Sequence, residues 1–305
     1  MLGEEITKIK MTNLQINDIT WKRTEEDKFF PVLKLWNRET KEFSPIPLNN
    51  YLFNFKLSTD KFCTGYTKDG QYVECKFNNK VDKSFSGQCP YCERIQGFKS
   101  TFIMGDLSHE RSEEILSQEY YIYLGYFEPG ILKVGTANTK RSSLRLIEQD
   151  CLVYCYIAKG IGYQVQKLEH LISKKFGITE NLKSNHKFKY LGIKPNQKHA
   201  EEKFESAFSR IKNEYLNTEY SSLFLENIKV KSLLEKNELF FPSKYKKFED
   251  TNLYGNFKGL RGRYLFLENE SNNAAFDINY LIGKDIEDYL DNYSYNFLEE
   301  QLSLI

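Results

Sequence analysis

The sequence lacks any run of about 18 apolar residues, so no segment is long enough to cross a membrane as a helix. Its first ten residues, MLGEEITKIK, contain no apolar stretch of the kind that a signal peptide needs. It also lacks low-complexity segments. We therefore expect a cytoplasmic protein without a membrane partner.

The sequence has almost no overall charge either, with a formal net charge of +1. This excludes a globally basic protein of the kind that coats nucleic acid. The charge is unevenly spread, because residues 131–192 hold eleven Lys or Arg against four Asp or Glu. A basic central segment between acidic flanks indicates a polyanionic partner, and a solvated Lys-rich face is the alternative.

The length of 305 residues predicts about two domains, and the mixture of strand and helix patterns predicts an α+β fold. Of the 305 residues, 40% are hydrophobic and 28% charged, which is ordinary for a globular chain. We predict four segments, namely an N-terminal β segment at 1–58, a Cys-rich zinc-binding module at 59–117, an α/β module at 118–192, and a helix with a C-terminal β segment at 193–305.

Local patterns place elements inside these segments. Strands are predicted at 32–36 and 51–57, with Pro45 and Pro47 breaking the chain between them. Residues 199–217 predict an amphipathic helix, because apolar side chains recur there at helical spacing. These are Phe204, Phe208, Ile211 and Tyr215.

One internal similarity links the two ends of the chain. VLKLWN at 32–37 resembles YLFLEN at 264–269, and NNYLFNFKL at 49–57 resembles INYLIGKDI at 278–286. This similarity predicts two strand–turn–strand units that share a sheet or small barrel, with the middle of the chain as an insertion. Chance similarity between short strands rich in Leu, Tyr and Asn is the alternative.

Four cysteines lie close together in the sequence: Cys63, Cys75, Cys89 and Cys92. The last two form a CxxC motif, preceded by Gly87, which suits the backbone of a tight turn. Disulfides are rare in a reducing cytosol, whereas four thiolates satisfy structural zinc. The segment is too poor in apolar residues to fold alone, and metal binding on the order of 10 kcal/mol would supply the missing free energy. Free thiols or a redox pair are the alternatives.

The α/β module begins with two apolar runs on either side of Glu128-Pro129-Gly130, which predict a hairpin. Its second strand contains Lys133-Val134-Gly135, and a charged side chain there raises the question of an active site. The elements predicted after the hairpin are a helix near 143–147, a strand at 151–158 with buried Cys151 and Cys155, a helix at 163–175, and a polar stretch at 184–187.

This order of elements resembles the GIY-YIG nuclease superfamily, in which a small three-stranded sheet is combined with helices. Gly-Ile-Tyr of the first strand becomes Tyr121-Ile122-Tyr123 here, and Tyr-Ile-Gly of the second becomes Lys133-Val134-Gly135, as in a branch that carries Lys. Over roughly residues 30–290 the chain resembles the uncharacterised domain of unknown function 2797 family. There a Cys-rich segment precedes such a module, and a segment like Gly-Leu-Arg-Gly-Arg-Tyr-Leu, here at 259–265, recurs.

The resemblance implies metal-dependent hydrolysis of a phosphodiester in DNA or RNA. This reaction needs a cation on the phosphate, an activated water and stabilisation of the leaving oxygen. Glu169 would hold Mg²⁺ or Mn²⁺ with bound waters, and Arg145 would grip the phosphate as a fork. Tyr123 would take a proton if Lys133 or Arg145 lowered its pKa from about 10. Asn185 would orient substrate or water.

The departures from the family pattern keep other functions open. Lys133 replaces a Tyr that positions the attacking water, and a protonated Lys is not a base. Tyr123 can also be a packing residue, Arg145 and Glu169 can lie on solvated helix faces, and Asn185 can cap a turn. The alternatives to a nuclease are a non-catalytic nucleic-acid-binding zinc protein on the same scaffold, and an interaction protein whose site is a relic.

Overall fold

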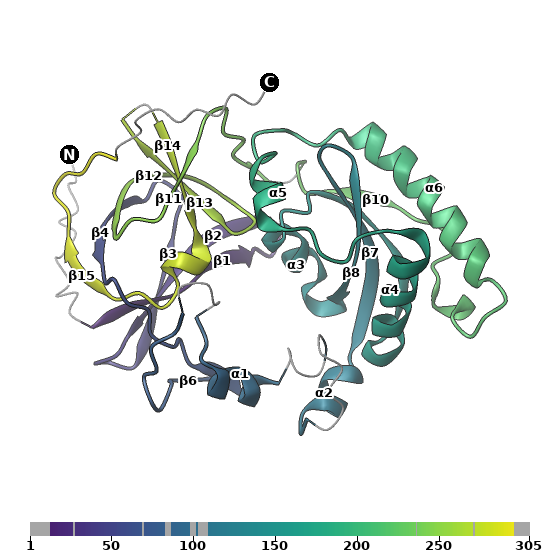
Figure 1. The fold of residues 1–305 in the computed structure, drawn as a ribbon, viewed down its shortest axis with the longest axis horizontal. Coiled ribbons are helices and arrows are strands. Elements are labelled where there is room, and N and C mark those ends of the chain that lie inside the picture. The colour runs from purple at the N-terminus through teal and green to yellow at the C-terminus, as the bar shows by residue number, and fades with distance from the viewer. Residues whose placement is uncertain are drawn as a thin grey trace.

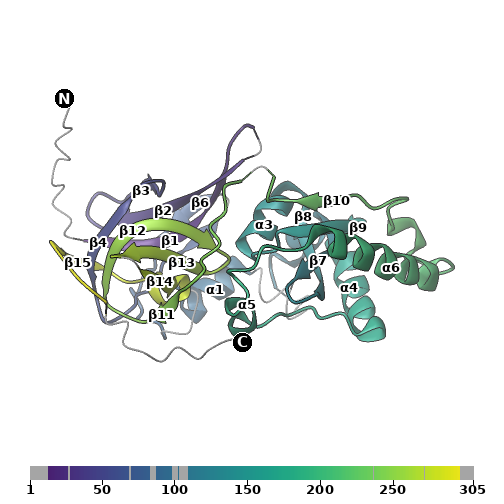
Figure 2. The same cartoon turned by 90° about the horizontal axis from the view of Figure 1, so that it is seen from above.

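The computed structural model describes residues 13–295 apart from 27, 69, 83–86, 98–101, 103–108, 236 and 271. One half is dominated by strands from both ends of the chain, and the other half combines strands and helices from its middle (Figure 1, Figure 2). The fold is therefore mixed α+β, as predicted. None of the helices described there is long and apolar enough to span a membrane.

The first sheet is antiparallel and has three strands: β1 (Leu14–Arg23), β2 (Phe29–Asn37) and β3 (Glu42–Pro47). The prediction that two prolines break the chain is wrong. Pro45 and Pro47 lie in β3, opposite Lys34 and Val32 of β2. Because β3 is an outer strand, the N–H groups that the prolines lack are not needed by a further strand.

The second sheet has six strands in the order β11-β14-β13-β12-β4-β15. Their bounds are β4 (Leu52–Leu57), β11 (Lys246–Phe248), β12 (Asn252–Arg261), β13 (Tyr264–Asn269), β14 (Asn272–Asp277) and β15 (Ile286–Tyr289). Strand β4 pairs antiparallel with both β12 and β15. The backbone of Ile16 in β1 also bonds to Gly283 and Lys284. Strands from the two ends of the chain therefore share a sheet, which is the packing that the sequence predicts.

The internal similarity does not extend to matching local structures. Asn279-Tyr280-Leu281 belongs to a short helix, α7 (Ile278–Leu281), whereas Asn50-Tyr51-Leu52 covers a turn and the start of β4. The carboxylate of Asp277 starts α7 by accepting a hydrogen bond from Asn279 N at 3.0 Å. This local cap favours the helix, so the predicted repeat is wrong in its second half.

The Cys-rich segment contains a small hairpin, β5 (Tyr66–Lys68) and β6 (Gln71–Val73), and helix α1 (Pro90–Gln96); helix α2 (Ser112–Leu116) follows later. The hairpin packs on the three-stranded sheet through aromatic rings, with the centroids of Trp36 and Tyr72 4.5 Å apart. Trp36 Nε1 also donates to Glu74 Oε1 at 3.1 Å. The segment is therefore fixed to the β-rich half.

The sheet of the α/β module has four strands in the order β10-β9-β7-β8, rather than the three predicted. They are β7 (Glu119–Phe127), β8 (Ile131–Asn138), β9 (Val153–Ile161) and β10 (Val230–Ser232). The short β10 comes from beyond residue 192 and pairs with β9, Val230 lying opposite Cys155. It pairs backbone groups that would otherwise be exposed at this part of the edge of β9.

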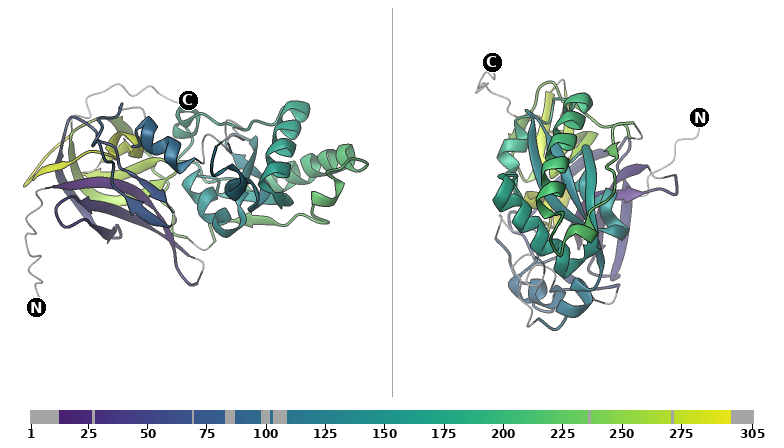
Figure 3. Two further views of the ribbon diagram at one scale, coloured as in Figure 1. Left: turned by 90° about the horizontal axis from the view of Figure 1, so that it is seen from below. Right: turned by 90° about the vertical axis from the view of Figure 1, so that its right-hand side faces the viewer.

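The helices of this half are α3 (Ser142–Glu148), α4 (Gly162–Phe176), α5 (Ser184–Phe188) and α6 (Gln197–Tyr215), with short 3₁₀ turns at Thr139–Arg141 and Ser221–Leu223. Helix α6 buries the four apolar residues that predict it from the sequence. Helix α4 buries Val165, Leu168 and Ile172 in the same way. Figure 3 shows helices of this half in front of the strands in its right-hand view.

The four-stranded sheet is covered on both faces, so β7 alternates between two cores. Ile122 and Leu124 pack with residues of α4 and α6. Tyr123 and Phe127 point the other way, into a core that includes residues of α3 and continues into the strands of the β-rich half. This shared core places one face of the module's sheet directly against the other half.

Candidate functional site

The hairpin of β7 and β8 explains why a Lys and a Gly stand two residues apart. In its register, Gly125 lies opposite Lys133, and Tyr123 lies opposite Gly135. A Cβ at Gly135 would lie 2.5 Å from Cζ of Tyr123, so the phenol ring crosses β8 where there is no side chain. The missing side chain at position 135 therefore allows the ring to reach Lys133.

A buried hydrogen-bond network forms around that ring. Lys133 Nζ donates to the hydroxyl of Tyr123 at 2.9 Å and to Oε1 of Gln149 at 2.8 Å. The Tyr123 hydroxyl donates to the same Gln149 oxygen at 2.8 Å. Tyr123 is fully buried and Lys133 is 7% exposed. Burial lowers the pKa of Lys133 to about 8, because the charged amine loses hydration.

Burial has the opposite effect on the phenol. It raises the pKa of Tyr123 well above its usual value, and the nearby charge of Arg145 opposes this only in part. A base at Tyr123 needs a lower pKa, so the structure lends no support to that predicted role. Tyr123 instead holds the Lys133 amine in place, together with Gln149.

Arg145 and Glu169 approach the same outer strand, β8, from its two faces. Arg145 is exposed on α3, and its charge acts on Tyr123 and Lys133. Glu169 lies on α4 and accepts a hydrogen bond from the Thr136 hydroxyl. Burial raises the pKa of Glu169 to about 7, while the Thr136 hydrogen bond and the charges of Lys133 and Arg145 oppose the rise. Four of the five predicted residues thus influence one another electrostatically.

The fifth predicted residue, Asn185, does not take part in this cluster. Its side chain is exposed on α5, and none of the contacts found among residues 13–295, where described, joins it to the other four. Lys187, two positions later, takes part instead. Its Nζ donates to the Gln149 carbonyl at 2.6 Å and lies 4.6 Å from the ring centroid of Phe127. Sequence reasoning missed Lys187, Gln149 and Thr136, and only the Lys content of the stretch pointed to the first.

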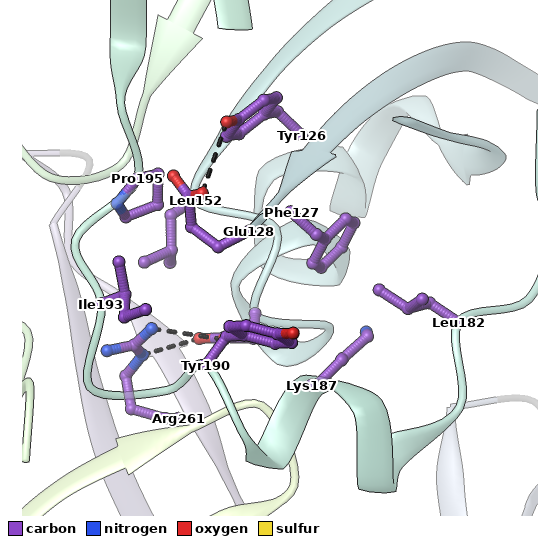
Figure 4. Close-up of a pocket in the computed structure, with 11 residues that line it drawn as sticks. Tyr126, Phe127, Glu128, Leu152, Leu182, Lys187, Tyr190, Ile193, Pro195 and Arg261 are labelled. Carbon is purple, nitrogen blue, oxygen red and sulfur yellow. Dashed lines mark hydrogen bonds and ion pairs between the residues drawn. The ribbon is translucent and has the colours of Figure 1, made fainter. Parts of the chain in front are cut away.

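A small cavity opens beside the cluster, where the two halves of the molecule meet (Figure 4). Its volume is about 20 Å³, which is room for a single water. Lys187, Tyr190 and Arg261 are among the residues that line it. The cavity is therefore too small for a nucleotide.

The four clustered cysteines meet the geometric requirement of a metal centre. The sulfurs of Cys63, Cys75, Cys89 and Cys92 all lie within 4.8 Å of one another, and all four residues are buried. Cys75 Sγ and Cys89 Sγ are 3.9 Å apart. Zn–S bonds of about 2.3 Å place tetrahedral sulfurs about 3.8 Å apart, which the Cys75–Cys89 separation matches, so the four thiols could hold a zinc ion.

Local hydrogen bonds orient these thiols. Cys89 N donates to Cys63 Sγ at 3.2 Å, and Asn79 Nδ2 donates to Cys89 Sγ at 3.4 Å. Such bonds are made to metal-bound thiolates, because they stabilise negative charge on sulfur. Cys151 and Cys155 lie apart from this group and are buried in the sheet cores, as predicted.

Comparison with known proteins gives a single family. The model of a family described as "Protein of unknown function (DUF2797)" matches residues 53–285. No curated protein and no solved structure matches the chain. The matched region spans β4 to the end of α7, and so includes the four cysteines, the polar cluster and most of the β-rich half's C-terminal strands. The chain therefore belongs to the DUF2797 family of proteins of unknown function.

Proposed function

We propose that this chain is a metal-dependent nuclease of the GIY-YIG type, which hydrolyses phosphodiester bonds in DNA or RNA. The observation that carries the proposal is the position of Lys133 on β8, with Arg145 of α3 and Glu169 of α4 close enough to act on its charge. Arg145 and Glu169 also act on the buried Tyr123, which supports a common role for the four residues.

The charges around β8 suit a phosphate. Lys133 and Arg145 act on the carboxylate of Glu169, and Lys187 adds a third cation that acts on Lys133. Arg145 is the most accessible of them, and its planar fork matches two phosphate oxygens. Lys133 is fixed by two hydrogen bonds and so provides a preorganised positive charge. The chain's own residues thus bind and orient the phosphate.

The side chains beside Glu169 fit a hydrated divalent cation. Glu169 and the Thr136 hydroxyl are both oxygen groups, which Mg²⁺ and Mn²⁺ prefer. Among the described residues, only the four cysteines form a group of three or more possible metal ligands, so Glu169 is not part of such a group. Water molecules would therefore supply most of the ligands of an ion at Glu169. When bound, the ion would supply positive charge that stabilises the charge developing on the phosphate.

The second candidate function is nucleic-acid binding without cleavage. Two observations favour it over the nuclease. The Tyr123 hydroxyl is committed to Lys133 and Gln149, and Glu169 lies on the opposite face of the sheet from that network. In that case the cations would grip phosphates without an activated water. Under both functions, zinc at the four cysteines would be structural, because four thiolates leave no open position.

A cleavage assay on mixed DNA and RNA separates the two functions. Mg²⁺ is omitted rather than chelated, since a chelator would also remove zinc. Glu169→Gln should lower Mg²⁺-dependent cleavage at least about 100-fold, because the amide keeps the shape and loses the charge. The matched control is Glu205→Gln, which removes the same charge from an exposed position on α6. Arg145→Ala should weaken both cleavage and binding.

Nucleic-acid binding is measured on the same variants. Glu169→Gln should leave it nearly intact, since removing a negative charge cannot weaken attraction to a polyanion. Binding by the wild type without any cleavage would support the second function. Cleavage that is unchanged in Glu169→Gln would remove Glu169 from the proposed site.

A further inference from the structure

The tip of the β12–β13 hairpin projects from the β-rich half towards the polar cluster. It carries Arg261-Gly262-Arg263 from the segment Gly-Leu-Arg-Gly-Arg-Tyr-Leu, which the proposed site does not use. Gly262 has a φ of +54°, and a Cβ there would lie 3.1 Å from Cβ of Asp150. The tip therefore approaches Asp150 at a distance that only glycine accommodates without a shift.

Arg261 connects the tip to Asp150. Its Nε donates to Oδ1 at 2.7 Å, and its Nη2 donates to Oδ2 at 3.3 Å. Nη1 donates to the carbonyls of Leu191 and Phe240, both at 2.9 Å. Arg261 is 2% exposed, and Figure 4 shows it beside Tyr190 at the small cavity. Each of the three guanidinium nitrogens of Arg261 donates a hydrogen bond, and two of them bind the carboxylate of Asp150. This two-pronged contact fixes Asp150 in orientation as well as in position.

Asp150 directly follows Gln149, the residue that holds the cluster together. The Gln149 side chain accepts from Lys133 and Tyr123, and its carbonyl accepts from Lys187. Asp150 itself has a φ of +61°, so this turn is held in a conformation that most residues avoid. Arg261 therefore binds Asp150, the residue directly after Gln149, and Gln149 orients the amines of Lys133 and Lys187.

Arg263, on the other side of the tip, reaches the helix that carries Lys187. Its Nε donates to Asp277 Oδ1 at 2.8 Å, and its Nη1 donates to Ser184 Oγ at 3.2 Å. Ser184 is the first residue of α5. One hairpin tip thus contacts both segments that bring side chains to the cluster, one with each arginine.

We infer that Arg261 and Arg263 are positioning residues of the site. Arg261 fixes the positions of Gln149 and Lys133 through Asp150, and Arg263 fixes the position of Lys187 through Ser184. The inference rests on the proposed function for its effect on catalysis. The β-rich half then serves as the support of the site, because neither arginine belongs to the α/β module.

Hydrogen exchange tests the positioning itself, independently of any cleavage. Arg261→Met should increase amide exchange at residues 145–152, and Arg263→Met should increase it at 184–190, each leaving the other segment unchanged. The control is Lys258→Met, which removes an exposed cation from the same strand, β12, where it pairs with Glu268. Unchanged exchange in both arginine variants, or exchange that rises equally across the whole chain, would overturn the inference.

Kinetics then test whether the positioning serves the reaction. Per folded molecule, Arg261→Met should lower kcat about 100-fold with little change in KM, as small misplacements of catalytic groups do. Arg261→Lys should restore little, because Lys cannot make the two-pronged contact. A purely structural link would instead reduce the folded fraction and leave kcat per folded molecule unchanged, which would overturn the inference. A wild type that binds but never cleaves would refute the nuclease alone, since the exchange result would stand.

Discussion

The described residues of the Cys-rich segment form almost no apolar core around its cysteines, whereas the four-stranded sheet beside it is covered by apolar side chains on both faces. The apolar residues described in that small cluster, besides the cysteines, are Val81 and the half-buried Tyr66. The sheet buries residues of α4 and α6 on one side and a core shared with the β-rich half on the other. The two regions therefore hold their polar groups in place by different means.

This difference shows where each region obtains its stability. Apolar burial contributes about 25 cal/mol per Å², so the small apolar cluster described around the cysteines offsets little of the conformational entropy of the segment. A structural zinc ion contributes more, about 10–16 kcal/mol in small zinc modules. The sheet has apolar cores on both faces, and its buried Lys133 and Tyr123 are joined by a hydrogen bond within this apolar setting. The two regions should thus respond differently to the same perturbations.

Removal of a cysteine ligand is expected to have the largest effect. Cys92→Ser should abolish zinc binding and unfold the Cys-rich segment, because a neutral hydroxyl does not replace a thiolate. We expect one zinc per chain in the wild type by elemental analysis, and exchange protection of residues 61–97 that is lost in the variant. The four-stranded sheet should keep its protection.

The matched control is Cys155→Ser, at a buried cysteine in β9. It should keep one zinc per chain and should destabilise the sheet instead. Less than about half an equivalent of zinc in wild type purified without chelator would contradict the metal centre. Loss of the sheet in Cys92→Ser would show that the two regions do not differ as described.

A cavity in the sheet core is expected to have the next largest effect. Leu168 is fully buried on α4, so Leu168→Ala should lower the free energy of unfolding by about 2–5 kcal/mol in denaturant. Zinc content should not change. Leu171→Ala, at a half-buried position on the same helix, should cost less. An equal cost at both positions would contradict the core that the structure assigns to α4.

Sequence reasoning located most of the elements and the cysteine cluster because these depend on local patterns. The spacing of Phe204, Phe208 and Ile211 predicts α6, and the four cysteines lie together as their spacing suggests. The strand β10 and the helix α7 were missed. Strand β10 forms because it pairs with the edge of β9, and helix α7 begins where Asp277 caps it. The spacing of apolar residues in the sequence shows neither interaction.

The site was predicted in part for the same reason. Tyr123 and Lys133 lie on adjacent strands, where a hairpin brings residues together whatever the rest of the fold does. Gln149 and Lys187 depend on Arg261 and Arg263, which are more than 70 residues away in the sequence. No local pattern encodes such long-range contacts, and the family resemblance points to Asn185 rather than to Lys187.

A methyl group at Gly135 tests the hydrogen-bonded centre of the sheet. Gly135→Ala should displace the Tyr123 ring and lower the free energy of unfolding by about 1–3 kcal/mol, as overpacking does. Because Lys133 would lose its phenol partner, cleavage or binding should fall as well. Denaturant unfolding and the cleavage assay measure the two effects. A variant as stable and as active as the wild type would contradict the placement of the ring across β8.

The smallest expected effect is a change of stability with pH, which should have opposite signs at Glu148 and at the four cysteines. Glu148 lies where α3 meets β1, next to Asp18, Thr20 and the cations Arg141 and Arg145. Burial raises the pKa of Glu148 above the ordinary 4.5, although Arg141 and Arg145 oppose the rise. The folded state then holds this proton more tightly than the unfolded state. Its contribution to stability is present in full below pH 4.5 and is lost as the pH rises through the raised value.

Zinc binding by thiolates has the opposite sign, because protons compete with the metal as the pH falls. Glu148→Gln mimics the protonated acid, so the stability of the wild type relative to this variant should decrease as the pH rises above 4.5. Denaturant unfolding across that range measures the difference, with Glu205→Gln as the exposed control, which should show no such trend. Zinc content should remain at one per chain at the upper end of the range and fall towards the lower end. If the relative stability of the wild type instead rose with pH, the ion pair of Glu148 Oε1 with Arg141 Nη2, at 3.1 Å, would outweigh burial and hold Glu148 in its charged form.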